Sequence, residues 1–435
     1  MTSIERRKEL NPKTTTYEFF GPFGALLITI GAPLVTYALY LTCSEESGGC
    51  PPNGLAMRTA LQNMAQQGWW MSVWDTEAML VYLGFYAFCV VAWAVLPGRI
   101  VEGVPLRTGG AKKYKINGLA TFICALCIAI AVIAIRGPES FTFFYDHWIG
   151  IITATIFMSV LQSLACYLHS FLPSKLLALG GNTGNPIYDF FIGRELNPSI
   201  GSFDLKSFNE LRPGLILWVL IDISMACAQA TRRGGLAKVT DSMWLVVFFQ
   251  VWYVGDSLYN ESAVFTTIDI ISDGLGFMLC FGCITWIPCT FSLQARYLVF
   301  APLELGPVNT SLILLVNVTG YHIFRSANNE KNDFRNGGNT RNLKYIHTAQ
   351  GSKLITSGWW GRSRHPNYLG DIIMAFAWSL PTGFNTPITY FYVTYFVILL
   401  IHRERRDDDK CAGKYGADWK TYKRIVPYRI LPLVY

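Results

Sequence analysis

Charged residues are scarce in this sequence. Only 15% of its 435 residues are Asp, Glu, Lys or Arg, whereas 51% are hydrophobic. This composition excludes an ordinary soluble enzyme of this length and favours an all-α integral membrane protein with many spans. The net charge of +7 suits anionic lipids and cofactors, and nothing in the sequence indicates a nucleic-acid partner.

Metal-binding and dinucleotide-binding motifs are also missing. There is no HExxH, and the eleven cysteines form no paired CxxC motifs at zinc spacing. The run GGNTGN at 180–185 departs from GxGxxG and follows no predicted strand, which excludes a Rossmann site. Cys124 and Cys127 lie within an apolar stretch, where packing is the expected role. Cys43 and Cys50 share one loop, where a disulfide and two free thiols are both open alternatives.

Ten apolar stretches approach or exceed the length of a membrane-crossing helix, although the last two are short. Their even number places both chain ends on one side of the membrane. No cleavable signal peptide is evident, so we expect the first span to be retained. The stretches are 21–41, 78–97, 117–135, 148–171, 213–230, 242–259, 275–299, 307–325, 368–384 and 388–402.

Basic residues indicate which side is cytosolic. They gather in the N-terminal arm (Arg6, Arg7, Lys8 and Lys13), in 99–115 and in 331–364, all on the side of the basic C-terminus. A short loop with Arg232, Arg233 and Lys238 would face the other way. Two long polar connections, 173–212 and 326–367, face the cytosol, and the first is too aromatic to be disordered.

The C-terminal third has two polar runs separated by about one short hairpin of spans. They are GSKLITSGWWGRSRHPNYLGD (351–371) and HRERRDDDKCAGKYGADWKTY (402–422). Polar side chains beside membrane-length apolar segments usually line a polar cavity or bind a ligand. The two runs therefore predict a cytosol-facing pocket for a charged cofactor at the bilayer surface.

Within these runs, the spacing of the residues suggests cofactor-binding roles, and each role has a structural alternative. Arg403 and Asp407, four residues apart, share a face if the helix continues past the bilayer, and can bind phosphate or ribose; a lipid-anchoring charged helix is the alternative. Trp359, Trp360 and Tyr368 can flank an aromatic or nicotinamide ring and Asn367 can bond an amide, or the segment is an interfacial aromatic belt.

Two further positions have a functional and a structural interpretation. Lys331 and Arg335, again four apart, can bind the 2′-phosphate and pyrophosphate of NADPH, or they mark a solvated helix end. Tyr253 lies within the sixth predicted span, where its hydroxyl can donate a proton or bond a carbonyl in the core.

Several long motifs together resemble the sterol reductase family, which includes Δ14-sterol reductases, 7-dehydrocholesterol reductase, Δ24(28)-sterol reductases and the membrane part of lamin B receptor. The resemblance covers nearly the whole chain and looks closest to the fungal Δ14 branch. The motifs are NPKTTTYEFFGPFGA, GNPIYDFFIGRELNPSIGSFDLKSFNELRPGLILW, TIDIISDGLGFML, YHIFRSANNEK and everything from Leu354 onward.

The resemblance implies an endoplasmic reticulum enzyme with ten spans that reduces a sterol with NADPH. It implies an arm at 1–20, a sterol-binding bundle at 21–300 with an ordered cytosolic loop at 173–212, and an NADPH-binding part at 301–435. It also leaves room for association with other sterol-biosynthesis enzymes. The implied cofactor residues are Lys331, Arg335, Ile355, Trp360, Asn367, Tyr368, Asp407, Cys411, Lys414, Tyr415 and Tyr422.

The expected reaction follows from the substrate. A sterol 14,15 double bond is electron-rich, so a proton must add at carbon 15 before hydride reaches carbon 14. We expect Tyr253, Arg403 and Asp407 to form the proton relay, in a dry pocket that protects the cation from water.

Three alternatives remain open on the sequence alone. The seventh span reads FGC at 281–283 where Δ14 members commonly read FGD, so reduction of a Δ7 or Δ24(28) bond is one alternative. RHPNYLGD also resembles the signature of isoprenylcysteine carboxyl methyltransferases, which use S-adenosylmethionine. A non-catalytic sterol-binding protein is the third.

Overall fold

The computed structural model describes residues 9–336, 339 and 341–435. Arg6, Arg7 and Lys8, which helped to orient the chain above, lie outside the described residues. The chain folds as two compact units, Met1–Val239 with Gln250–Pro302 and Thr240–Phe249 with Leu303–Tyr435.

Six helical segments among the described residues are long and apolar enough to cross a membrane. They coincide with the first five and the seventh of the predicted spans. The first four expose many apolar side chains, whereas the last two are mostly buried inside the protein. The segments are α2 (Gly21–Leu41), α5 (Thr76–Val95), α6 (Gly118–Arg136), α8 (Trp148–His169), Leu205–Arg233 and Phe277–Phe300.

The last two of these segments are composite. Leu205–Arg233 joins α10 (Leu205–Leu211) to α11 (Pro213–Arg233), and Phe277–Phe300 joins α14 (Phe277–Phe281), α15 (Ile287–Phe291) and α16 (Leu293–Phe300) through a π-helical turn at Gly282–Trp286. The turn lies against α11 so tightly that a Cβ on Gly214 would come within 1.7 Å of the Cys283 carbonyl oxygen.

The other four predicted spans are helical but less apolar or shorter. They correspond to α12 (Asp241–Tyr259), α17 (Gly306–Asn336), α18 (Pro366–Ser379) and α19 (Phe391–Tyr415). α18 has only 14 residues, and α17 and α19 each end in a charged segment. The structure thus supports an integral membrane protein, and the count of ten spans stays a prediction.

The all-α expectation is incomplete, because the described residues include three two-stranded antiparallel sheets. Each is a short hairpin whose strands are too brief, or too polar, to show a long alternating pattern. The pairs are β1 (Arg99–Pro105) with β2 (Ala111–Ile116), β3 (Ser199–Ile200) with β4 (Phe203–Asp204), and β5 (Tyr345–His347) with β6 (Lys353–Ile355).

The remaining elements are short. The helices are α3 (Gly54–Gln67), α4 (Trp69–Val73), α7 (Phe143–Asp146), α9 (Pro186–Ile192), α13 (Ile268–Ile271) and α20 (Ala417–Ile425). Single 3₁₀ turns are Pro138–Phe141, Leu236–Lys238, Glu261–Thr266, Trp359–Gly361, Leu380–Thr382 and Ile388–Tyr390.

The connection 173–212 is ordered, as its aromatic content predicts. It contains α9 and α10, and Tyr188 and Phe191 are buried in a cluster with Phe277 and Phe281. The backbone of Gly193, at φ 91°, approaches Gly276 so closely that a Cβ on Gly193 would lie 2.4 Å from the Gly276 nitrogen. The arm packs on the same connection through the Thr14 N–H, which donates to the Asn182 carbonyl oxygen at 3.0 Å.

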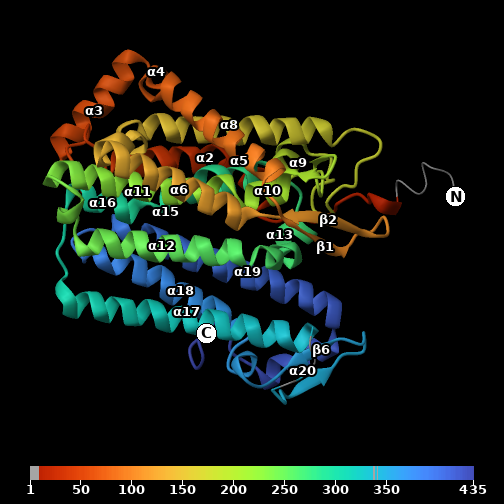
Figure 1. Cartoon of the computed structure of the whole chain (residues 1–435). Helices are drawn as coiled ribbons and strands as arrows, with labels where there is room; N and C mark the ends of the chain where they lie inside the picture. Colours follow the sequence, from red (N-terminus) through yellow and green to blue (C-terminus); the bar gives the residue numbers. More distant parts are fainter. Residues whose placement is uncertain (1–8, 337–338, 340) are drawn as a thin grey trace. The chain divides into compact units, whose positions relative to one another are not determined.

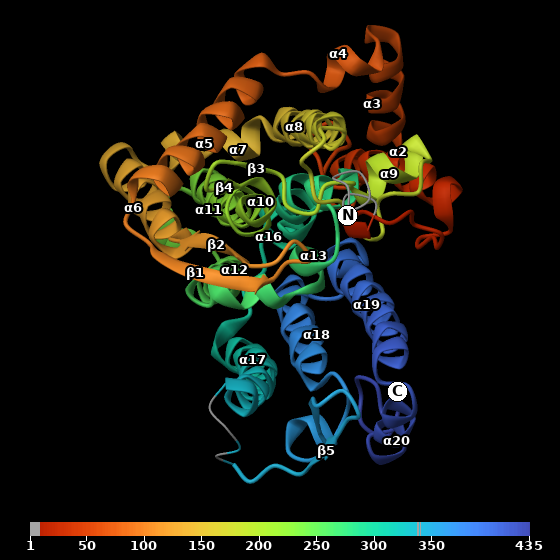
Figure 2. The same ribbon diagram turned by 90° about the vertical axis from the view of Figure 1, so that its right-hand side faces the viewer.

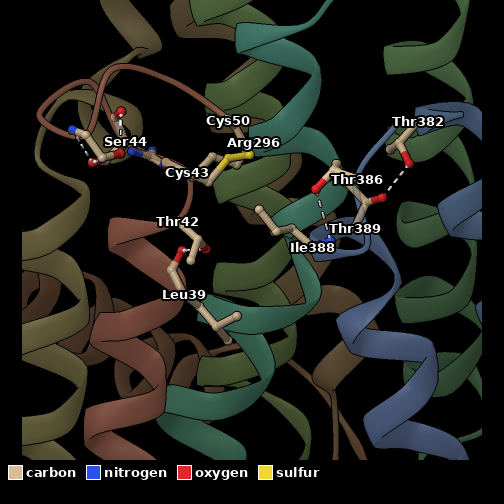
Figure 3. The surroundings of a disulfide bond; sticks show 11 residues. Leu39, Thr42, Cys43, Ser44, Cys50, Arg296, Thr382, Thr386, Ile388 and Thr389 are labelled. Atoms are coloured by element: carbon tan, nitrogen blue, oxygen red, sulfur yellow. Dashed lines mark hydrogen bonds between the residues drawn. A yellow bond between two sulfur atoms is a disulfide. The ribbon is translucent and has the colours of Figure 1, made fainter. Parts of the chain in front are cut away.

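The loop after α2 is closed by a disulfide between Cys43 and Cys50. Figure 3 shows Arg296 reaching from α16 toward this loop, where its Nε donates to the Cys43 carbonyl oxygen at 2.6 Å. Arg232, one of the basic residues that disagreed with the charge rule, forms an ion pair with Glu45 and donates to the Tyr145 hydroxyl. The charge of Arg232 is therefore compensated locally.

In the second unit α18 packs between α17 and α19 (Figure 1). The α17–α18 crossing is close because glycines face each other: a Cβ on Gly370 would lie 2.6 Å from the Gly320 carbonyl oxygen. The β5–β6 hairpin and α20 lie at the same end of these helices (Figure 2). Trp419, Tyr422 and Val426 are buried there against side chains from the hairpin and the end of α19.

Candidate functional site

The last turns of α17 meet the loop that precedes α18. Lys331 Nζ lies 3.9 Å from the centre of the Trp360 ring, and Trp360 Nε1 donates to the Ala327 carbonyl oxygen at 2.8 Å. The Trp359 N–H donates to the buried Glu330 carboxylate at 2.8 Å. Gly358, at φ 64°, fits between them, because a Cβ there would lie 2.5 Å from Glu330 Oε1. The loop is thus fixed against α17 with one lysine on an indole face.

The first turn of α18 begins at Pro366, which suits the first helical position. The His365 ring stacks on Tyr368 with centroids 4.7 Å apart, and His365 Nε2 lies 3.7 Å from Asp407 Oδ2 on α19. Asn367 Oδ1 is buried and has no hydrogen-bond partner among the described residues. A buried acceptor without a donor is unusual and indicates a place where a ligand N–H can bind.

Helix α19 continues well past its apolar half, as the spacing of Arg403 and Asp407 requires. Both residues are partly buried on the charged extension that ends at Tyr415. The same extension carries Glu404, whose side chain is 0% exposed. Its two oxygens accept from Arg364 Nη2 at 3.5 Å and from Arg429 Nη1 at 2.8 Å.

This buried carboxylate with two guanidinium partners was missed by sequence reasoning. Arg364 and Arg429 lie 40 and 25 residues from Glu404, so no local spacing indicates the contacts. The C-terminal tail completes the arrangement, since the backbone N–H groups of Arg364 and His365 donate to the carbonyls of Tyr428 and Arg429 at 2.9 and 2.8 Å. The C-terminal tail therefore packs against the loop that carries Arg364 and His365.

A second unanticipated group surrounds Asp408. Trp419 Nε1 donates to its carboxylate at 2.7 Å, and Lys423 Nζ does so at 3.2 Å. Although burial alone raises the pKa of this carboxyl, these two donors hold the pKa below its usual value. Asp408 is thereby kept ionised, and it ties α20 to α19.

Burial lowers the pKa values of two groups at the site. It lowers the pKa of Lys331 to about 8, with the Arg335 cation adding to the effect. It also lowers the pKa of His365 to about 3, reinforced by Lys331 and Arg364. His365 is consequently neutral near pH 7, and at 3.7 Å its ring is too far from the Asp407 carboxylate for a direct hydrogen bond.

The structure brings some of the predicted residues together and leaves others apart. Lys331, Trp360, Asn367, Tyr368 and Asp407 come from α17, the loop and the facing ends of α18 and α19. Cys411, Tyr415 and Tyr422 pack in or beside the hydrophobic cluster of α20, and Ile355 is buried in β6. Arg335 and Lys414 are exposed. Tyr253 lies on α12 in the first unit, with its ring 6.2 Å from that of Trp218.

Comparison with known proteins identifies the family of this chain. Residues 13–435 match the model of the ergosterol biosynthesis ERG4/ERG24 family. The chain belongs to this family. The match runs from the N-terminal arm to the last residue, so it includes both units and the whole polar set at the end of α17, α18 and α19.

Individual members of the ERG4/ERG24 family are similar over almost their full length. A Δ14-sterol reductase of Schizosaccharomyces pombe is 46% identical, with 96% of this chain and 97% of the relative covered. A Candida albicans Δ14-sterol reductase is 43% identical over 99% and 100% of the two chains. The Saccharomyces cerevisiae Δ14-sterol reductase is 42% identical over 98% and 99%.

Proposed function

We propose that this protein is a Δ14-sterol reductase of ergosterol-type biosynthesis that uses NADPH to reduce the 14,15 double bond of sterol 8,14-dienes. The observation that carries the proposal is the full-length similarity to Δ14-sterol reductases of several fungi. The six apolar helices fit an enzyme that takes its substrate from a membrane. We place it in the endoplasmic reticulum with both termini in the cytosol.

The residues at the cofactor site fit NADPH. Lys331 offers a cation on the Trp360 ring for a phosphate group. Asn367 offers a buried acceptor for a carboxamide N–H. NADPH would supply the hydride there. Ile355, Cys411, Tyr415 and Tyr422, from the predicted set, would support the site mainly through packing, while Arg335 and Lys414 would reach phosphates from its exposed edge.

The chain's own polar groups would control the proton. Asp407 and Arg403 lie one helical turn apart on α19, and neutral His365 faces Asp407 at 3.7 Å. We propose that Tyr253, Arg403 and Asp407 take part in the relay that delivers the proton to the sterol. The apolar surroundings would exclude water from the resulting cation.

The cysteine at 283 bears on which double bond is reduced. Cys283 Sγ donates to Glu210 Oε2 at 3.4 Å, so a carboxylate lies directly beside the position that is commonly an aspartate. This supports Δ14 reduction in spite of the substitution. Reduction of a Δ7 or Δ24(28) bond remains the second candidate.

Expression in a yeast strain that lacks Δ14 reduction tests the reaction. Sterols are analysed by mass spectrometry, and the accumulated 8,14-dienols should disappear. Persistence of these dienols together with rescue of a Δ7 or Δ24(28) defect would assign the enzyme to another branch.

The cofactor is tested by heat protection of the purified protein. NADPH should raise the unfolding temperature because it binds the native state only. Protection by S-adenosylmethionine instead would indicate a methyltransferase, and tight sterol binding without NADPH oxidation would indicate a non-catalytic protein.

The relay is tested by Asp407→Ala and Arg403→Ala. We expect each variant to lose dienol reduction while it remains inserted in the membrane, because each removes a charge next to the reacting groups. Near-normal activity in both variants would exclude these residues from the mechanism.

A further inference from the structure

A second polar site lies in the first unit, at the far end of α2 from the N-terminal arm. α2 has 21 residues and spans about 30 Å, so the loop 42–53 is a membrane thickness away from the arm. Two adjoining cavities of 360 and 270 Å³ lie beside this loop, and Tyr40, Glu46 and Ile149 line both. Neither cavity includes a residue of the proposed cofactor site.

Arg296 is the unusual residue of the smaller cavity. It lines the cavity yet is only 3% exposed, and its Nε is held by the Cys43 carbonyl oxygen. The rings of Tyr40, Tyr145 and Trp148 lie 5.2 to 5.6 Å from its guanidinium carbon. Its Nη1 is buried and has no hydrogen-bond partner among the described residues. A buried guanidinium nitrogen without a hydrogen-bond partner indicates a place where an added acceptor, such as an anion, can bind.

The two glutamates of the cavity differ in their partners. Glu45 forms an ion pair with Arg232 and accepts from the Tyr145 hydroxyl at 2.5 Å. Glu46 accepts only from the neutral Tyr40 hydroxyl, at 2.6 Å, and forms no ion pair within the described part of the chain. Asp146 also lines the smaller cavity, and its carboxylate accepts from the Thr142 hydroxyl at 2.6 Å. Arg296 and Glu46 form no ion pair with each other within the described residues, although they are close enough to interact electrostatically.

The neighbouring helix places the cavities at the height of a membrane surface. Trp69, Trp70 and Trp74, in and beside α4, are 62%, 59% and 46% exposed. Exposed tryptophans of this kind are typical of the membrane–water boundary. The larger cavity continues toward this segment along Ala60 and Met64, which offer an apolar surface.

We propose that the paired cavities bind a zwitterionic phospholipid headgroup. Its phosphate would bind Arg296, and its ammonium group would bind Glu46 and the ring faces that surround it. The glycerol end would continue over Ala60 and Met64. An anionic headgroup fits less well because Glu45 and Glu46 face it, and a simple cation leaves Arg296 unpaired.

The test uses the full-length protein in a neutral detergent with soluble short-chain lipids. Dihexanoyl phosphatidylcholine, dihexanoyl phosphatidylglycerol and free phosphocholine are titrated, and apparent affinities are obtained from the rise in unfolding temperature. We expect the zwitterionic lipid to bind about tenfold more tightly than the anionic one, the effect of one charge pair.

Substitutions test which residues are responsible for the lipid preference. Glu46→Gln should abolish the preference for phosphatidylcholine, whereas Glu139→Gln, an exposed glutamate outside both cavities, should keep it. Arg296→Lys should weaken both lipids; if that variant does not fold, Glu46→Gln decides alone. The proposal is overturned if the wild-type protein shows no preference or if Glu46→Gln retains it. Equal stabilisation by free phosphocholine would replace the lipid with a soluble zwitterion. None of these outcomes depends on the reductase assignment.

Discussion

The pH dependence of cofactor binding is the sharpest test of the site around Lys331. Lysine binds a phosphate as a cation, and burial lowers the pKa of this lysine to about 8. Below that pH Lys331 carries its charge and the site is ready for a phosphate. Above it the free enzyme must first take up a proton, so the affinity for NADPH should fall as the pH rises.

The magnitude follows from one linked proton. Affinity should fall up to about tenfold per pH unit above the pKa. A hydrogen bond to a charged group contributes about 1.5–3 kcal/mol, so the decline should level off at roughly 10- to 150-fold. NADH, which lacks the 2′-phosphate, shows which phosphate Lys331 contacts. If the affinity for NADH does not change with pH, Lys331 contacts the 2′-phosphate; if it falls in parallel with the affinity for NADPH, Lys331 contacts the pyrophosphate.

The assay is binding of NADPH to the purified protein between pH 7 and 10, followed by energy transfer from tryptophan to the reduced nicotinamide. Lys331→Arg should bind with no decline above pH 8, because arginine stays protonated. Lys420→Arg, at an exposed lysine on α20, is the matched control and should behave as the wild type. A wild-type profile without a decline, or the same decline in Lys331→Arg, would refute the reasoning.

Two further predictions concern stability. Glu404→Gln should lower the free energy of unfolding by about 3–5 kcal/mol, and with it the unfolding temperature, because it removes the buried charge that two guanidinium groups share. Asp409→Asn, at an exposed residue of the same helix, should have little effect. Equal unfolding temperatures for the two variants would contradict the role of Glu404. Gly370→Ala should cost about 1–3 kcal/mol in the same thermal assay, because its Cβ would lie 2.5 Å from the Phe324 nitrogen. Gly413→Ala, where a Cβ meets open space on α19, should be neutral or stabilising, and a match between the two alanine variants would disprove the close packing.

Some of this architecture is readable from the sequence because the signals are local. The apolar runs predict six of the observed membrane-length helices. The four-residue spacing of Arg403 and Asp407 predicts a shared helix face once α19 is known to continue. The aromatic content of 173–212 likewise predicts an ordered connection.

The features that could not be predicted from the sequence depend on contacts between residues far apart in the chain. Glu404 sits in a charged run that resembles an exposed helix, and only the fold brings Arg364 and Arg429 to it. For Tyr422 a family motif suggests a cofactor contact, and the structure shows its ring buried with Trp419 and Val426, so its cofactor role stays a prediction. A tyrosine in a motif does not by itself distinguish binding from packing.

The arrangement of α19 explains why the candidate cofactor site lies at a helix end. A charged group within hydrocarbon is expensive, so the apolar half of the helix cannot carry the polar set. The extension beyond it can, but an unsupported extension would fray. Glu404 prevents this by binding Arg364 from the loop and Arg429 from the tail, while Asp408 binds Trp419 and Lys423 of α20. Asp407 lies between these two anchored carboxylates, and its position is therefore fixed by neighbours that need not touch the cofactor at all.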